Sequence, residues 1–77
     1  MAHRLMCLLR VRRLERGMTQ EELSEQLLKK GLEVSQQTLS KIENNRVSMS
    51  PQLWRACSII LNVPMELFYD WPPLLKK

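Results

Sequence analysis

The chain of 77 residues has few of the residues that build sheets and tight turns. It contains two glycines and few β-branched residues, whereas Leu, Glu, Gln, Arg and Lys are frequent. Because these frequent residues favour helices, the composition predicts an all-α chain. A chain of this length buries one hydrophobic core, so we expect a single domain at residues 1–70 and a short tail at residues 71–77.

Cysteine and histidine are scarce as well. Cys7 and Cys57 lie far apart, form no Cys-x-x-Cys pair and have only His3 as a possible companion. A zinc site therefore lacks ligands and a disulfide framework lacks cysteines. We expect no bound metal, and two reduced thiols that pack as small hydrophobic side chains.

The sequence also has no long hydrophobic run and no recognisable catalytic motif. No apolar segment approaches the roughly 20 residues that span a bilayer, so we expect a cytoplasmic protein that does not enter membranes. The absence of a Gly-rich phosphate loop and of a nucleophile–base set argues against an enzyme, a cofactor or a small-molecule ligand. The net charge of +4 favours an anionic partner, for which nucleic acid is the leading candidate.

Start and stop signals divide the chain into five predicted helices. Thr19 and Glu22 form a capping box, and Ser50 before Pro51 is a second strong start signal. Gly31 is placed to end a helix. The predicted helices cover residues 4–16, 20–30, 36–44, 51–61 and 64–70. We expect a core of Leu23, Leu27, Leu28, Leu39, Ile42, Leu53, Cys57, Ile60, Leu61, Leu67 and Phe68.

The predicted helix at residues 36–44 has an unusual polar surface. Leu39 and Ile42 face inward, which leaves two amides, a hydroxyl and an ammonium group on the other side. Glutamine can pair with adenine N6 and N7, and lysine can donate to guanine O6 or N7. A glutamine-rich surface that is simply solvated is an equally good interpretation from this helix alone. The polar surface consists of Gln36, Gln37, Ser40 and Lys41.

Three segments carry a resemblance to a known family. The segments RRLERGMTQEELSEQL, VSQQTLSKIENNR and LNVPMELF resemble the Cro/C1-type (XRE-like) helix-turn-helix domain of phage repressors and small bacterial regulators, over residues 9–68. The resemblance implies a compact five-helix, lambda-repressor-like domain in which helices 2 and 3 form the helix-turn-helix. It also implies a sequence-specific regulator of transcription, a repressor, that binds double-stranded DNA as a homodimer with helix 3 in the major groove.

The resemblance implies roles for single residues. It assigns base reading to Gln36, Gln37, Ser40 and Lys41, and an ion pair between helices 1 and 3 to Arg13 and Glu43. Phosphate contacts are implied for Arg10, Gln20, Ser35, Thr38, Asn44, Asn45 and Arg46.

The chain departs from the family pattern between helices 2 and 3. The residues LKKGLE between Leu27 and Val34 are longer than the usual turn, so either helix 2 gains a turn or the loop bulges. The longer connection can shift helix 3 in the groove and bring Lys29 or Lys30 to the DNA backbone. A protein-interaction module, such as an antitoxin-like accessory subunit on the same scaffold, is the alternative function.

The apolar residues near the C-terminus have two interpretations. Dimerisation would double the few base contacts that one small domain makes, and these residues are candidates for the contact between two copies. They can equally close over the core of their own domain. The residues concerned are Phe68, Tyr69, Trp71, Leu74 and Leu75.

Overall fold

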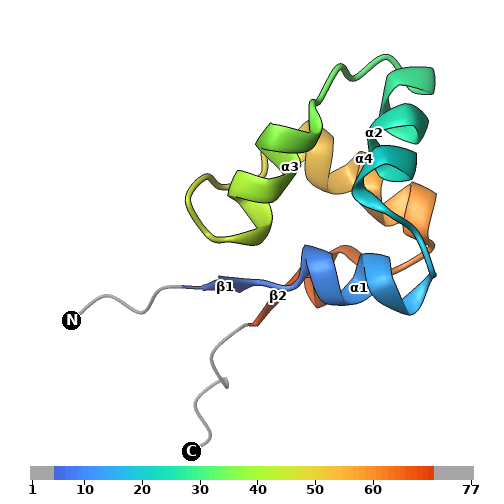
Figure 1. Cartoon of the computed structure of the whole chain (residues 1–77). Helices are drawn as coiled ribbons and strands as arrows, with labels where there is room; N and C mark the ends of the chain where they lie inside the picture. Colours follow the sequence, from blue (N-terminus) through green and yellow to red (C-terminus); the bar gives the residue numbers. More distant parts are fainter. Residues whose placement is uncertain (1–4, 71–77) are drawn as a thin grey trace, which may run out of the picture.

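The computed structural model describes residues 5–70, which form a small, mostly helical domain (Figure 1). This part of the chain contains four α-helices, one 3-10 helix and a two-stranded sheet. None of its helices is long and apolar enough to cross a membrane. The elements are β1 (Met6–Cys7), α1 (Leu9–Glu15), α2 (Gln20–Lys29), α3 (Gln36–Glu43), α4 (Pro51–Leu61), η1 (Met65–Phe68) and β2 (Tyr69–Asp70).

Three helices begin at the predicted residues because a side chain caps each first turn. Thr19 Oγ1 accepts a hydrogen bond from Glu22 N at 3.0 Å, and Glu22 Oε1 accepts one from Thr19 N at 2.8 Å, which completes the capping box of α2. The side chains of Ser35 and Ser50 cap α3 and α4 by accepting hydrogen bonds from Thr38 N and Leu53 N. Pro51 occupies the first position of α4, where no backbone donor is needed.

The same helices end at residues that take a left-handed backbone conformation. Gly31 follows α2 with φ 87°, and Asn45 and Asn62 follow α3 and α4 with φ 63° and 56°. Glycine adopts this conformation without a steric penalty, and asparagine tolerates it better than most residues. These ends fix the direction in which the chain leaves each helix.

The first helix is shorter than predicted. The prediction placed it at residues 4–16, but α1 begins at Leu9, and Met6–Cys7 form β1. β1 pairs antiparallel with β2, Cys7 opposite Tyr69, and Leu8 N donates to Phe68 O at 2.7 Å. The backbone before α1 therefore bonds to the far end of the described chain, a long-range pairing that overrides local helix propensity. The prediction of an all-α chain is corrected to a mostly helical one.

The fifth predicted helix is not an α-helix. The prediction covered residues 64–70, where the structure has the 3-10 helix η1 followed by β2. Leu67 N donates to Pro64 O at 3.0 Å, and Tyr69 is extended, with φ −134° and ψ 149°. Pairing with β1 draws Tyr69 and Asp70 out of the helix, so residues 5–70 contain four α-helices instead of five.

The core joins all four α-helices and η1, and three residues that were predicted to lie in it are not fully buried. Leu28 is 60% exposed because Leu23 and Leu27 occupy the inward side of α2. Leu67 is 43% exposed, since Phe68 fills the core position of η1, and Ile60 is only half-buried. The buried apolar residues are Cys7, Leu9, Leu23, Leu27, Leu39, Ile42, Met49, Leu53, Ala56, Cys57, Leu61, Val63 and Phe68.

The connection between α2 and α3 is anchored to the domain. α2 ends at Lys29, so the additional residues lie in the connection and do not extend the helix. Leu32 and Val34 pack against the core, and Ser24 Oγ donates to Val34 O at 2.6 Å. α2 packs against both α3 and α4, and α1 contacts α3 (Figure 1). These contacts hold α3 against the body of the domain with one side in solvent.

Candidate nucleic-acid interface

The outer side of α3 brings together the residues predicted to read bases. Leu39 and Ile42 are buried, so the side chains that point away from them face solvent. Amide and ammonium groups arranged in this way can donate to and accept from base edges in a major groove. Gln36, Gln37 and Lys41 are exposed, and Ser40 is half-buried.

Ser35 and Thr38 hold the start of α3. Ser35 Oγ accepts a hydrogen bond from Thr38 N at 3.1 Å and donates one to Thr38 Oγ1 at 3.1 Å. Both residues were predicted to contact phosphates, but their hydroxyls bond to each other and to the helix. The first amides of an α-helix have no partner within the helix, so the backbone of this turn offers donors to an anion.

One buried carboxylate links three helices. Arg13 on α1 donates to Glu43 on α3 through Nε to Oε2 at 2.8 Å and through Nη2 to Oε1 at 3.1 Å. Gln20 on α2 donates through Nε2 to Glu43 Oε1 at 3.0 Å. The side chains of Arg13 and Glu43 are 7% and 3% exposed. Arg13 Nη1 also donates to Met18 O at 2.8 Å, so the structure contains the expected ion pair within a larger network.

Gln20 thus has a structural contact that sequence reasoning missed. It was predicted to bind a phosphate at the start of α2, where it is the first helical residue and half-buried. Its amide nitrogen bonds to Glu43, 23 positions later in the chain. No local sequence signal indicates this bond, because it depends on the packing of α2 against α3.

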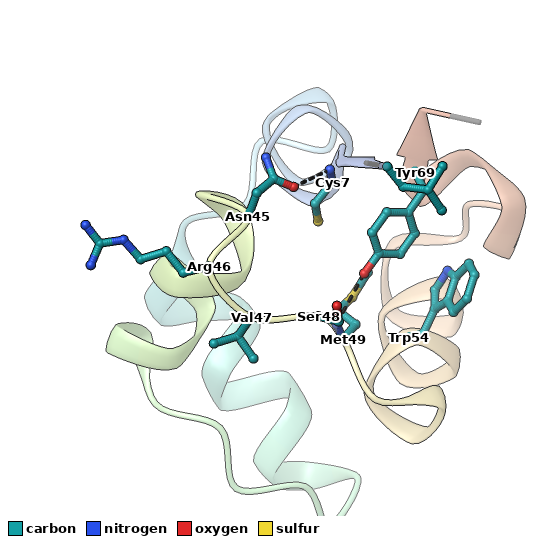
Figure 2. A pocket seen from close by; sticks show the side chains of 9 residues that line it. Cys7, Asn45, Arg46, Val47, Ser48, Met49, Trp54 and Tyr69 are labelled. Atoms are coloured by element: carbon teal, nitrogen blue, oxygen red, sulfur yellow. Dashed lines mark hydrogen bonds between the residues drawn. The ribbon is translucent and has the colours of Figure 1, made fainter. Parts of the chain in front are cut away.

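The loop after α3 carries three residues predicted to contact phosphates. Arg46 is exposed, and its guanidinium points away from the cavity behind the loop (Figure 2). Asn44 Nδ2 donates to Ser40 Oγ at 3.4 Å. Asn45 Oδ1 accepts a hydrogen bond from Cys7 N at 2.7 Å, so this side chain ties the loop to β1 (Figure 2). Arg46 is the one of the three with an exposed charge.

The arginines of α1 and its C-terminal turn have separate surroundings. Arg12 Nε donates to Leu67 O at 2.8 Å, and Arg12 also pairs with Glu15. Arg16 donates through Nε to the carbonyl of Leu61 at 2.6 Å and through Nη2 to that of Asn62, and so binds the C-terminal end of α4. Arg10 is exposed, and within residues 5–70 its side chain makes no hydrogen bond or ion pair. Of the three, it is the arginine whose charge is available to an anion.

A cavity of about 410 Å³ lies behind the loop at residues 45–49 (Figure 2). The rings of Trp54 and Tyr69 form part of its lining. They meet edge to face, with their ring centroids 5.2 Å apart. Tyr69 Oη accepts a hydrogen bond from Met49 N at 3.2 Å, and Trp54 Nε1 donates to Met65 O at 2.7 Å. These contacts connect β2, α4 and the loop, and thereby support the end of α3.

The predicted dimer contacts are only partly present in the described residues. Phe68 is 0% exposed and belongs to the core of its own domain, in agreement with the alternative that these residues close over that core. It is buried because the pairing of β1 with β2 draws the end of η1 over the core. Tyr69 is half-buried and lines the cavity. The other three residues, Trp71, Leu74 and Leu75, lie outside the described residues.

The two thiols are buried and protonated at neutral pH. Burial raises the pKa of Cys57 to about 12, and it also raises the pKa of Cys7. A neutral thiol is a poor nucleophile and a poor metal ligand. Among residues 5–70, no group of three or more His, Cys, Asp or Glu side chains is placed to hold a metal ion.

The arrangement of helices agrees with the comparison with known families. Comparison with curated proteins gives no match. The pattern that defines the helix-turn-helix family matches residues 9–68, which include α1 to α4 and η1. The match spans most of the chain, and we conclude that the protein belongs to the Cro/C1-type helix-turn-helix family of DNA-binding domains.

Proposed function

We propose that the protein is a sequence-specific regulator of transcription that inserts α3 into the major groove of double-stranded DNA. The observation that carries the proposal is the exposed side of α3, where Gln36, Gln37 and Lys41 present amides and an ammonium group. The buried network around Glu43 holds this helix against α1 and α2. A helix that is held against its neighbours and presents exposed polar groups along one side suits direct readout of bases.

Affinity in this proposal comes from phosphate contacts around the reading helix. Arg10 and Arg46 supply exposed charges, and the first turns of α2 and α3 supply backbone amides. Gln20, in the first turn of α2, and Asn44, at the end of α3, also contact phosphates. The side chains of Ser35, Thr38 and Asn45 support phosphate binding indirectly, because they fix the backbone of α3 and its loop.

We infer that the protein acts in the cytoplasm as a homodimer and as a repressor, without catalytic activity. One domain makes few base contacts, whereas two domains on a two-fold operator double them, with half-sites about 34 Å apart. The domain at residues 1–70 reads DNA, and the tail at residues 71–77 contributes Trp71, Leu74 and Leu75 to the dimer beside Tyr69. A dimer bound over a promoter excludes RNA polymerase from the same DNA.

Selection from random DNA duplexes, followed by sequencing, tests this function. We expect recovery of a two-fold symmetric site, bound with an affinity that falls steeply as salt concentration rises. The alternative is a protein-interaction module on the same scaffold, held by an apolar interface. Such a module would recover no common sequence, and its binding to a partner would change little with salt. Recovery of no enriched site would contradict the proposal.

A further inference from the structure

A groove lies between α4 and the lengthened connection that follows α2. α4 contributes residues at positions i, i+3, i+4 and i+7, which form a single stripe along two turns of the helix. The connection forms the opposite wall, and the groove has a volume of about 470 Å³. Among the residues that line this groove, termed the α4 groove, are Lys30, Leu32, Gln52, Arg55, Ala56 and Ile59.

The floor of the α4 groove is apolar. Ile59, in the last turn of α4, is 57% exposed. Ala56 is buried beside it, and Leu32 is half-buried against the core. An isoleucine left this exposed in a concave site gains free energy when another apolar side chain covers it.

The rim of the α4 groove is basic. Lys30 and Arg55 line it, and within residues 5–70 neither side chain forms an ion pair or hydrogen bond with the protein. The ion pairs found in that region are Arg12 with Glu15 and Arg13 with Glu43. Glu33, the nearest acidic residue in the connection, is exposed and does not line the groove. The charge complement of the groove is therefore an acidic ligand.

We propose that the α4 groove binds a short amphipathic acidic helix of a partner protein. Apolar side chains of that helix cover Ile59 and Leu32, and its carboxylates pair with Lys30 and Arg55. The stripe from Gln52 to Ile59 is about 10 Å long, which accommodates roughly two turns of a helix. An interface of this size belongs to the class of weak and transient protein contacts.

This inference does not rest on the proposed DNA binding, because the proposed function assigns no base or phosphate contact to a residue of the groove. Lys30, one of the two lysines that the longer connection was expected to bring to the DNA backbone, lines the groove. The additional residues between α2 and α3 form one of its walls. The departure from the family pattern therefore contributes to this binding site. Two cations alone would suit phosphate, but the exposed apolar floor has no complement in a DNA backbone. An acidic helix matches both features.

A second copy of the protein offers a competing ligand. α2 exposes Glu21, Glu25 and Leu28 at spacing i, i+4 and i+7, which is also an acidic and apolar stripe. Occupation of the groove by α2 of another copy would produce self-association that depends on Arg55. We assign the groove to a different protein, and the experiment separates the two possibilities.

Fluorescence anisotropy with a synthetic peptide tests the proposal. The labelled probe is a helical peptide of about 14 residues, roughly four turns, with leucines along one side and glutamates beside them. We expect wild-type protein to bind it, and Arg55→Glu and Ile59→Ala each to weaken binding at least about tenfold. The same peptide with glutamine in place of glutamate should bind at least about tenfold more weakly.

Arg46→Glu is the matched control, because it changes net charge equally at the other surface. We expect it to keep peptide binding and to lose DNA binding, whereas Arg55→Glu should keep DNA binding. Circular dichroism verifies that each variant is folded, and sedimentation measures self-association. The proposal would be overturned if Arg46→Glu and Arg55→Glu weakened peptide binding equally. It would also be overturned if folded Arg55→Glu lost DNA binding, or if Arg55→Glu abolished self-association. If the protein binds the peptide but selects no DNA site, the proposed function is contradicted and this inference is supported.

Discussion

Arg13 on α1 and Glu43 on α3 form a two-bond ion pair that is almost removed from solvent, with Nε to Oε2 at 2.8 Å and Nη2 to Oε1 at 3.1 Å. The carboxylate also accepts a hydrogen bond from Gln20 Nε2 on α2, so one group sets the position of α3 relative to both preceding helices. None of these side chains needs to touch DNA for this effect. The hydrogen bonds to Glu43 within the domain therefore orient the exposed side of α3.

Loss of the Glu43 carboxylate should destabilise the domain strongly. Glu43→Ala leaves the Arg13 guanidinium buried without its partner, and we expect the free energy of unfolding to fall by about 3–5 kcal/mol. The exposed pair of Arg12 with Glu15 provides the control, because Glu15→Ala should cost less than about 1 kcal/mol. Chemical denaturation measures both values. Similar losses in the two variants would contradict a structural role for Glu43.

Substitution of Arg16 should lower stability, whereas substitution of Arg10 should weaken DNA binding. Arg16→Ala removes two hydrogen bonds to the end of α4, each worth about 1.5–3 kcal/mol to a charged donor, and we discount this for partial exposure to about 1–2 kcal/mol in total. Arg10→Ala should leave the unfolding midpoint unchanged. It should reduce the slope of log affinity against log salt by about 0.9, the value for one phosphate contact. A lower melting temperature for Arg10→Ala, or an unchanged salt slope, would argue against this division.

The local signals in the sequence predicted much of the helical framework. Thr19 with Glu22, Ser35, and Ser50 with Pro51 start helices where predicted, because a cap acts over three residues and is visible in the sequence. Met6–Cys7 were predicted as helix and form a strand, since their partners are Tyr69–Asp70. A pairing across the length of the domain leaves no local pattern.

In the candidate site, too, the features set by local helix geometry were predictable and those set by packing between elements were not. The outward position of Gln36 and Gln37 followed from the inward position of Leu39 and Ile42, a relation fixed by helical geometry. The bond from Gln20 to Glu43 and that from Cys7 N to Asn45 Oδ1 depend on how elements pack, so the sequence did not indicate them. Their roles at DNA remain predictions.

Asn45 should be needed both for its backbone conformation and for its side chain. Asn45→Ala keeps neither the tolerance for φ 63° nor the acceptor for Cys7 N, and we expect a loss of about 2–3 kcal/mol. Asn45→Gly keeps the backbone conformation and removes the side chain that accepts from Cys7 N, so its stability should lie between those of wild type and Asn45→Ala. Hydrogen exchange at the Cys7 amide should accelerate in both variants. Equal stability of the two variants would show that the positive φ carries no cost.

The Cys57 thiol should make stability depend on pH in alkaline solution. Burial raises its pKa from the ordinary value of 9.0 to about 12, so the folded state holds the proton while the unfolded state releases it. This contribution is present in full below pH 9 and declines as pH rises from 9 toward 12. Denaturation at a series of pH values should show a shallower decline for Cys57→Val, which lacks the titrating group. Parallel pH profiles for the two proteins would contradict the assignment.

The most direct test of base reading by α3 compares wild type with Gln36→Ala and Gln37→Ala on one operator. Gel shifts measure affinity for the selected operator and for the same duplex with the bases of its two half-sites changed. We expect each substitution to reduce the ratio of the two affinities by about tenfold, since one paired amide contact discriminates by about 1–3 kcal/mol. Binding to unrelated DNA should persist, because phosphate contacts supply it. An unchanged ratio in both variants would show that α3 does not read the sequence.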